Sequence, residues 1–202
     1  AGIARTEVFA GDYLDEPQIT IISPTRDFYE SLLPKFRNKL NFHWALEALE
    51  ENLYSSKDDI SDETTLSKTL DDATDDTSAH NKSSIVFLLE TDEKQKFLFT
   101  GDAGRDAFNH VPQTLLGKVK DVTWMKVPHH GSKHNLDSTI IKHVNPEIAY
   151  ISTEKQGKYL NRSTVFALKK NGTKVYSTSQ NRSTIRHGAI KTREGWTKIE
   201  PM

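Results

Sequence analysis

Short apolar runs and stretches of helical spacing alternate with polar turns along most of the chain. Runs rich in β-branched and aromatic residues predict strands, and apolar positions three and four residues apart predict helices. Strands are expected over Gln18–Ser23, Ser83–Glu90, Lys96–Asp102, Val122–Val127, Ile148–Ser152 and Lys174–Ser177. Helices are expected over Phe28–Phe36, Asn41–Leu53, Gly104–Leu116 and Ser163–Lys170. A polar turn between the second and third strands predicts that they form a hairpin in the centre of a sheet.

Two of these runs stop abruptly at polar residues beside a glycine. The run Lys96–Ala103 contains Asp102 at its end, and the run Val122–Ser132 contains His129 and His130 near its end. Carboxylates and imidazoles are the donors that a Zn²⁺ hydrolytic site uses, and neighbouring strand ends can bring distant donors to one ion. Adjacent side chains on extended backbone point in opposite directions, so only one of the two histidines is expected to face such a site.

Both strand ends also have a purely structural interpretation. Asp102 after a glycine can cap the helix expected over Gly104–Leu116, whose first turn favours a negative charge. The histidine pair can form a polar turn after its strand. For Asp102 taken alone, the helix cap is the favoured interpretation. When His129 and the order of the flanking motifs are considered as well, a metal ligand is favoured.

Three short motifs follow one another in the chain, Asn81-Lys-Ser-Ser84, Phe97-Leu-Phe-Thr-Gly-Asp-Ala103 and Val127-Pro-His-His-Gly-Ser132. In this order they resemble the second half of a metallo-β-lactamase-fold hydrolase, closest to the branch of the competence-type DNA-uptake proteins. The resemblance extends roughly from Ile19 to Ile199. It implies an α/β fold that forms half of an αββα sandwich, with a mixed sheet flanked by helices.

The resemblance also implies roles for the polar residues at the two strand ends. Asp102 would bridge two zinc ions, or two manganese ions, and His129 would be a ligand of one of them. Asp102, His130 and Ser132 would form the catalytic group. In it, Ser132 would hydrogen-bond an anion, while His130 would orient a loop, donate to a substrate phosphate or form an outer hydrogen bond. Metal ions in such a site lower the pKa of a bound water and polarise the scissile bond.

The family's main metal motif, His-x-His-x-Asp-His, does not occur in the 202 residues. The chain is therefore interpreted as one domain that corresponds to the C-terminal portion of the fold. The N-terminal half would be a separate chain or a missing segment, and it would be a partner of this chain. The completed protein is expected to be a metal-dependent hydrolase, above all of phosphodiester bonds in nucleic acid or nucleotides. The alternative is a catalytically silent binding or partner module that has lost its metal site.

The segment 55–80 changes character to acidic and small polar residues. Between Ser55 and Ser78 eight carboxylates stand against two lysines, with few large apolar groups. Such a composition cannot bury enough surface to offset chain entropy, so this segment is expected to be a mobile insertion. Its paired aspartates could suggest a calcium site. The glycine and final glutamate of a calcium-binding loop are missing, which favours a solvated acidic segment.

Composition sets further bounds. Cysteine is absent, which excludes disulfides and thiolate metal sites and agrees with a cytoplasmic protein. No apolar run approaches the roughly 18 residues that span a bilayer, so no membrane partner is expected. The net charge is −1, but between Glu154 and Lys198 eleven lysines and arginines stand against two glutamates. This basic third is a candidate contact for a phosphodiester backbone, although scattered surface lysines also follow from solubility alone.

Overall fold

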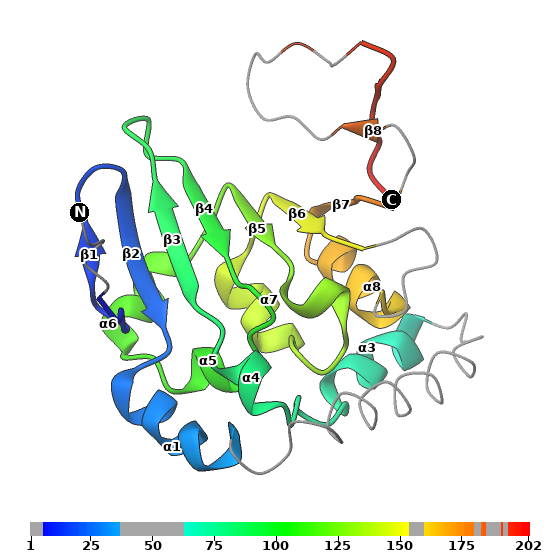
Figure 1. Cartoon of the computed structure of the whole chain (residues 1–202). Coiled ribbons are helices and arrows are strands. Elements are labelled where there is room, and N and C mark those ends of the chain that lie inside the picture. The colour runs from blue at the N-terminus through cyan, green and yellow to red at the C-terminus, as the bar shows by residue number, and fades with distance from the viewer. Residues whose placement is uncertain (1–5, 37–62, 154–159, 180–182, 185–190, 192–193) are drawn as a thin grey trace.

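The main feature of the fold is a seven-stranded mixed sheet (Figure 1). The structure is a computed structural model that describes residues 6–36, 63–153, 160–179, 183–184, 191 and 194–202. The sheet contains β1 (Tyr13–Leu14), β2 (Gln18–Ser23), β3 (Val86–Glu90), β4 (Lys96–Phe99), β5 (Trp124–Lys126), β6 (Ile148–Ile151) and β7 (Lys174–Ser177). Two further short strands, β8 (Ser183–Thr184) and β9 (Thr197–Lys198), pair in parallel.

The strands follow one another across the sheet in the order in which they occur in the chain. The first four strands pair antiparallel, and β4 to β7 pair parallel. The predicted hairpin is confirmed as β3 and β4, with Phe87 opposite Phe99, and it lies in the middle of the sheet. The α/β class and the mixed sheet are therefore as expected.

Seven described helices and two 3₁₀ turns connect or flank these strands. They are α1 (Arg26–Phe36), α3 (Glu63–Asp71), α4 (Ala79–Lys82), α5 (Asp106–Asn109), α6 (Gln113–Leu116), η1 (Gly117–Val119), η2 (Pro128–Gly131), α7 (Ser138–Val144) and α8 (Arg162–Lys170). The helices predicted at Phe28–Phe36 and Ser163–Lys170 are confirmed as α1 and α8. The helix predicted over Asn41–Leu53 lies outside the described residues.

The single helix predicted over Gly104–Leu116 is wrong. The chain forms two short helices there, α5 and α6, with Pro112 immediately before the second. Proline has no N–H to donate and disfavours helical backbone at the residue before it, so the first helix ends early. Helix α7 was not predicted at all. Asp137 caps it, because its carboxylate accepts the N–H of Ile140 at 2.8 Å.

The described part of the segment 55–80 differs from the mobile insertion that its composition suggested. Helix α3 packs against α8, and Leu70 on α3 is completely buried. Asp76 and Ser78, which follow α3, are also buried. A count of carboxylates ignores where the few apolar side chains fall. Here Leu70 enters the core, and the guanidinium of Arg105 donates to its carbonyl. Residues 55–62 lie outside the described residues.

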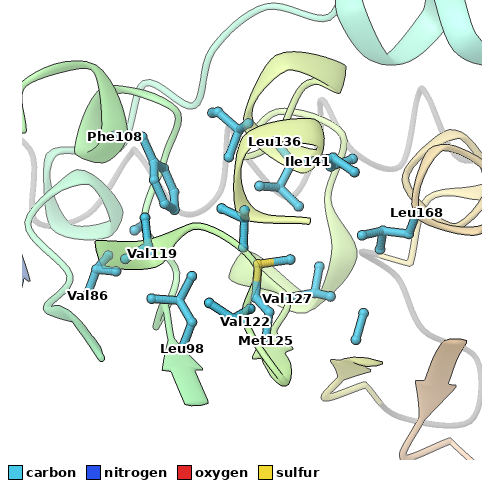
Figure 2. Close-up of a cluster of buried hydrophobic side chains, with 14 of the residues drawn as sticks. Val86, Leu98, Phe108, Val119, Val122, Met125, Val127, Leu136, Ile141 and Leu168 are labelled. Carbon is cyan, nitrogen blue, oxygen red and sulfur yellow. The ribbon is translucent and has the colours of Figure 1, made fainter. Parts of the chain in front are cut away.

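The hydrophobic core lies between the helices and one face of the sheet. Strand residues Val86, Leu98 and Met125 belong to one buried cluster with Ile141 of α7 and Leu168 of α8 (Figure 2). Because β4 to β7 are adjacent in chain order, crossovers of one hand carry all their helices to the same face of the sheet. These helices therefore do not cover the opposite face of the sheet.

That opposite face carries a row of aromatic rings, here named the aromatic face: Phe87, Phe99, Trp124, Tyr150 and Tyr176. The rings touch from strand to strand, with centroids 4.6 Å apart for the first pair, then 4.8, 5.3 and 5.7 Å along the row. All five are half-buried. Burial raises the pKa of the Tyr150 hydroxyl, and the neighbouring Tyr176 raises it further. A row of large apolar rings is a surface suited to packing against another layer.

Candidate functional site

The candidate site lies where β4 and β5 end side by side. The two strands are parallel, so their carboxyl ends meet at the same edge of the sheet. The hydroxyl of Thr100 donates to the carbonyl of Lys126 at 2.6 Å, and the N–H of His129 donates to the carbonyl of Gly101 at 3.3 Å. These two bonds join the turns that follow the strands. Asp102 and His129 are therefore brought to one edge, the place where α/β sheets usually bind ligands.

A tight turn presents Asp102 at this edge. Gly101 has a φ of +54°, and a Cβ at this position would come within 3.0 Å of the Cβ of Ser84, so the turn requires glycine. The hydroxyl of Ser84 accepts the N–H of Asp102 at 3.3 Å. Helix α5 begins at Asp106 after Arg105, so Asp102 is not its cap.

The Asp102 carboxylate faces a lysine. The Nζ atom of Lys126 lies 3.3 Å from Oδ1 of Asp102 and also donates to the carbonyl of Gly101. The Asp102 side chain is 39% exposed. Burial lowers the pKa of the Lys126 ammonium, and the charge of Asp102 offsets part of that shift. Asp102 thus places a carboxylate at the rim of the sheet, and the partly desolvated ammonium of Lys126 is its counter-ion.

The turn after β5 has an unusual backbone. His129 has φ 42° and ψ 52°, His130 has φ 55° and ψ 19°, and Gly131 has φ 90°. The expectation of extended backbone at the two histidines is wrong, because the chain turns immediately after Pro128. Left-handed conformations cost about 1–2 kcal/mol for each non-glycine residue, so the surroundings must hold this turn in place. The N–H of Asn161 donates to the Gly131 carbonyl at 3.2 Å and supplies one such contact.

The ring of His129 is buried against Asp76, a residue that sequence reasoning did not select. Nδ1 of His129 lies 3.3 Å from Oδ2 of Asp76 and 3.2 Å from Oδ1 of Asn135. The Asp76 side chain is only 3% exposed. Its Oδ2 also accepts the side-chain amides of Asn81 and Asn135, each at 2.9 Å, and its Oδ1 accepts the N–H of Ser78 at 2.8 Å.

These contacts determine the charge of Asp76. Burial raises the pKa of its carboxyl, but the hydrogen bonds from His129, Asn81, Ser78 and Asn135 lower it by more, to about 2. The carboxylate is therefore ionised at neutral pH although it is almost completely buried. A buried charge with this many partners is stable only as part of the whole network.

Arg105 holds the segment that carries Asp76 against the rest of the molecule. Its buried guanidinium donates to four main-chain carbonyls at 2.8–3.1 Å, those of Leu70, Ala73, Lys133 and Leu136. The first two belong to the segment before Asp76, and the last two to the loop after η2. One arginine thus fixes both sides of the site relative to each other.

The remaining predicted site residues lie around this centre. Nδ1 of His130 donates to the carbonyl of Ser152 at 2.6 Å, which anchors its ring beside the end of β6. Ser132 is buried, and its hydroxyl accepts the N–H of His134 at 3.3 Å. Asn135 links the His129 ring to the backbone of Asp102, because its side-chain nitrogen donates to the main-chain carbonyl of Asp102 at 3.2 Å. His130 is held on the β6 side, and Ser132 within the loop. The catalytic roles of His130 and Ser132 stay predictions.

The two predicted metal ligands, the carboxylate of Asp102 and the imidazole of His129, both follow strands that end at this edge. Within the described part of the chain, no group of three or more histidine, aspartate or glutamate side chains could hold an ion together. The donor types fit one side of a zinc or manganese site. The remaining ligands would have to come from elsewhere.

Asp76 is the residue of the site that sequence reasoning missed, although one signal could have pointed to it. It lies five residues before Asn81, the first residue of one of the three motifs. The acidic composition around Asp76 suggests exposure instead. Its contact with His129 and Asn135 depends on long-range packing, which local patterns do not contain.

Comparison with known proteins gives one informative match. ComE operon protein 3 of Bacillus subtilis (strain 168) is 30% identical over 128 residues, which cover 62% of this chain and 16% of that protein. The chain therefore spans about a sixth of that relative's length. No protein-family model matches the chain, and no solved structure does. None of the described helices has the length and hydropathy needed to cross a membrane.

Proposed function

We propose that this chain forms one side of the active site of a metal-dependent hydrolase with a metallo-β-lactamase-like fold, acting on phosphodiester bonds. The observation that carries the proposal is the placement of Asp102 and His129 after adjacent parallel strands. Asn135 contacts the His129 ring and the main-chain carbonyl of Asp102. The three motifs around them and the similarity to ComE operon protein 3 support a relation to the competence-type branch.

The chain's own residues have distinct tasks in this proposal. Asp102 offers a partly exposed carboxylate, and His129 offers an imidazole whose Nδ1 edge is held by Asp76 and Asn135. Zinc or manganese ions, when bound, would supply a hydroxide nucleophile near neutral pH and polarise the scissile bond. Lys126 would move from the Asp102 carboxylate when a metal cation takes its place, since both cannot neutralise the same oxygen atoms.

The remaining ligands would come from another part of the protein, on the same polypeptide or on a separate one. The aromatic face supports this partner. A second sheet packed on it would complete a four-layer sandwich and bury the five half-exposed rings. Such a sheet would end near the same edge as β4 and β5, where its own side chains could reach Asp102 and His129.

Nucleic acid or nucleotides are the proposed substrate. The basic third of the chain contains eleven lysines and arginines against two glutamates, which suits a phosphate backbone. Composition and the proposed family relation support this substrate.

The experiment isolates the tagged protein from its own cells under mild conditions, together with whatever polypeptide stays bound. Its metal content and its hydrolysis of bis(p-nitrophenyl) phosphate are then measured. The proposal predicts bound zinc or manganese and a hydrolysis that is lost in Asp102→Asn and His129→Gln. The exposed Asp72→Asn, on the same acidic segment as Asp76, is the matched control and should keep the activity.

A second candidate function is a catalytically silent binding module. The Lys126 ammonium on the Asp102 carboxylate favours it, because a lysine can permanently replace a metal cation as the counter-ion of a carboxylate. This alternative predicts that the isolated protein contains no zinc or manganese and does not hydrolyse the ester. Lys126→Met would then destabilise the site without any gain of metal binding, whereas under the hydrolase proposal the same change should strengthen metal binding.

A further inference from the structure

The buried contact between Asp76 and His129 determines where the imidazole carries its proton. Three residues make up the contact: Asp76 after α3, His129 in η2 and Asn135 in the loop that follows. The carboxylate and the ring come from two segments that are far apart in the sequence. Arg105 holds the two segments together through their main-chain carbonyls.

The orientation of the Asn135 amide is fixed by its own surroundings. Its nitrogen lies 2.9 Å from Oδ2 of Asp76, 3.2 Å from the carbonyl of Asp102 and 3.3 Å from the carbonyl of Ala103. All three atoms are acceptors, so the NH₂ group must point at them. The amide oxygen therefore points at Nδ1 of His129, 3.2 Å away.

Nδ1 of His129 thus faces two acceptor oxygens, one from Asn135 and one from Asp76 at 3.3 Å. A lone pair on Nδ1 would be directed at two other sets of lone pairs, in a buried site where repulsion is weakly screened. A proton on Nδ1 turns both contacts into hydrogen bonds. The carboxylate of Asp76 is the stronger acceptor of the two because it is ionised.

We infer that Asp76 is a positioning residue that holds the His129 proton on Nδ1, so that the neutral ring presents its lone pair at Nε2. The importance of this for catalysis rests on the proposed hydrolase function, in which Nε2 is the ligand atom. The tautomer itself does not, because it follows from hydrogen bonds within the chain. The left-handed backbone of His129 and the Asp76 contact together fix the direction of the ring.

The test is long-range ¹H–¹⁵N NMR of the histidine rings in the full metal-free chain above the pH at which they protonate. His129 signals are assigned by their loss in His129→Gln. The wild type should show one tautomer at His129, with Nδ1 in the protonated range and Nε2 in the unprotonated range. A His129 ring protonated on Nε2 would overturn the inference. The tautomer is read from the wild-type protein, and His129→Gln is needed only to assign the signals.

Asp76→Asn then tests whether the carboxylate is responsible. It should shift His129 toward a mixture of tautomers, and Asp76→Glu should recover part of the wild-type pattern. His130 and His134 are internal controls, because their Nδ1 atoms donate to the carbonyls of Ser152 and Thr74 and should keep their signals. A His129 tautomer unchanged in a folded Asp76→Asn would assign the proton's position to Asn135 alone and contradict the role of Asp76.

The two proposals fail separately. A wild-type Nδ1–H tautomer with no hydrolysis in the isolated protein would leave this inference standing and remove the hydrolase proposal. Hydrolysis with an Nε2–H tautomer would do the reverse. If both hold, Asp76→Asn should lower metal affinity or activity by roughly 10- to 100-fold, the usual effect of losing a residue that orients a metal-binding histidine.

Discussion

Two carboxylates at the same edge of the sheet are neutralised in different ways. Asp76 is 3% exposed and has four hydrogen-bonding partners, all fixed by the fold. Asp102 is 39% exposed and faces the end of one flexible lysine. The first carboxylate is a permanent structural anion, whereas the second has a counter-ion that another cation can replace. Under the proposed function the two carboxylates divide the work, because Asp76 would keep the geometry of the site and Asp102 would receive the metal.

The difference predicts that Asp76 contributes most to stability. Asp76→Ala would leave several buried donors without an acceptor, so the free energy of unfolding should fall by about 3 kcal/mol. Urea unfolding followed by circular dichroism measures the change. The exposed Asp72→Ala is the matched control and should change stability by less than about 0.5 kcal/mol. Equal effects of the two substitutions would show that the Asp76 network carries no special weight.

The pH dependence of stability sharpens the same contrast. The pKa of Asp76 is lowered in the folded protein, from 3.8 to about 2, so its contribution is fully present above the unfolded pKa and is lost as the pH falls toward 2. At 1.36 kcal/mol per pKa unit this contribution is about 2 kcal/mol. The difference in unfolding free energy between wild type and Asp76→Asn should therefore shrink by that amount between about pH 5 and about pH 2. A difference that stays constant over this range would contradict the lowered pKa.

The turn that presents Asp102 is expected to be rigid, although the counter-ion of the Asp102 carboxylate can be replaced. Gly101→Ala would place a Cβ on backbone with a positive φ and only 3.0 Å from the Cβ of Ser84. It should therefore lower the free energy of unfolding by about 2 kcal/mol. Gly172→Ala is the control, since it also has a positive φ but has no heavy atom within 4 Å of the added Cβ. It should cost about 1 kcal/mol. Thermal unfolding compares the two, and equal losses would mean that the contact with Ser84 is not tight.

The smallest effect is expected at Asp102 itself. Asp102→Asn removes a partly exposed ion pair with Lys126, and such pairs contribute about 0–1 kcal/mol. Its free energy of unfolding should therefore stay within about 1 kcal/mol of the wild type in urea. A loss as large as that of Asp76→Ala would mean that both carboxylates are structural and would remove the contrast between them.

Much of the fold could be predicted from local patterns. Short runs of β-branched and aromatic residues predict the central strands, and the polar turn after Glu90 predicts the hairpin, because both signals depend on neighbouring residues only. Helix α7 was missed although Asp137 caps it. The helix expected over Gly104–Leu116 contains Pro112, and the chain divides there into two short helices because proline interrupts helical hydrogen bonding.

The candidate site was only partly predictable. Asp102 and His129 follow from strands that end in polar residues, and the structure brings these ends together. Asp76 could not be found in this way, because its burial depends on Arg105 binding two distant segments. The left-handed turn at His129 was equally hidden, since local preference favours other backbone conformations for histidine.

The most direct test of the account is a titration of the full chain with Mn²⁺, observed by NMR. Mn²⁺ binds carboxylate and imidazole ligands and broadens the signals of nearby nuclei. We predict early broadening of the His129 ring signals in the wild type, weaker broadening in Asp102→Asn and stronger broadening in Lys126→Met. His129 signals that respond equally in all three proteins, or do not respond while exposed acidic residues do, would contradict a shared metal position for Asp102 and His129.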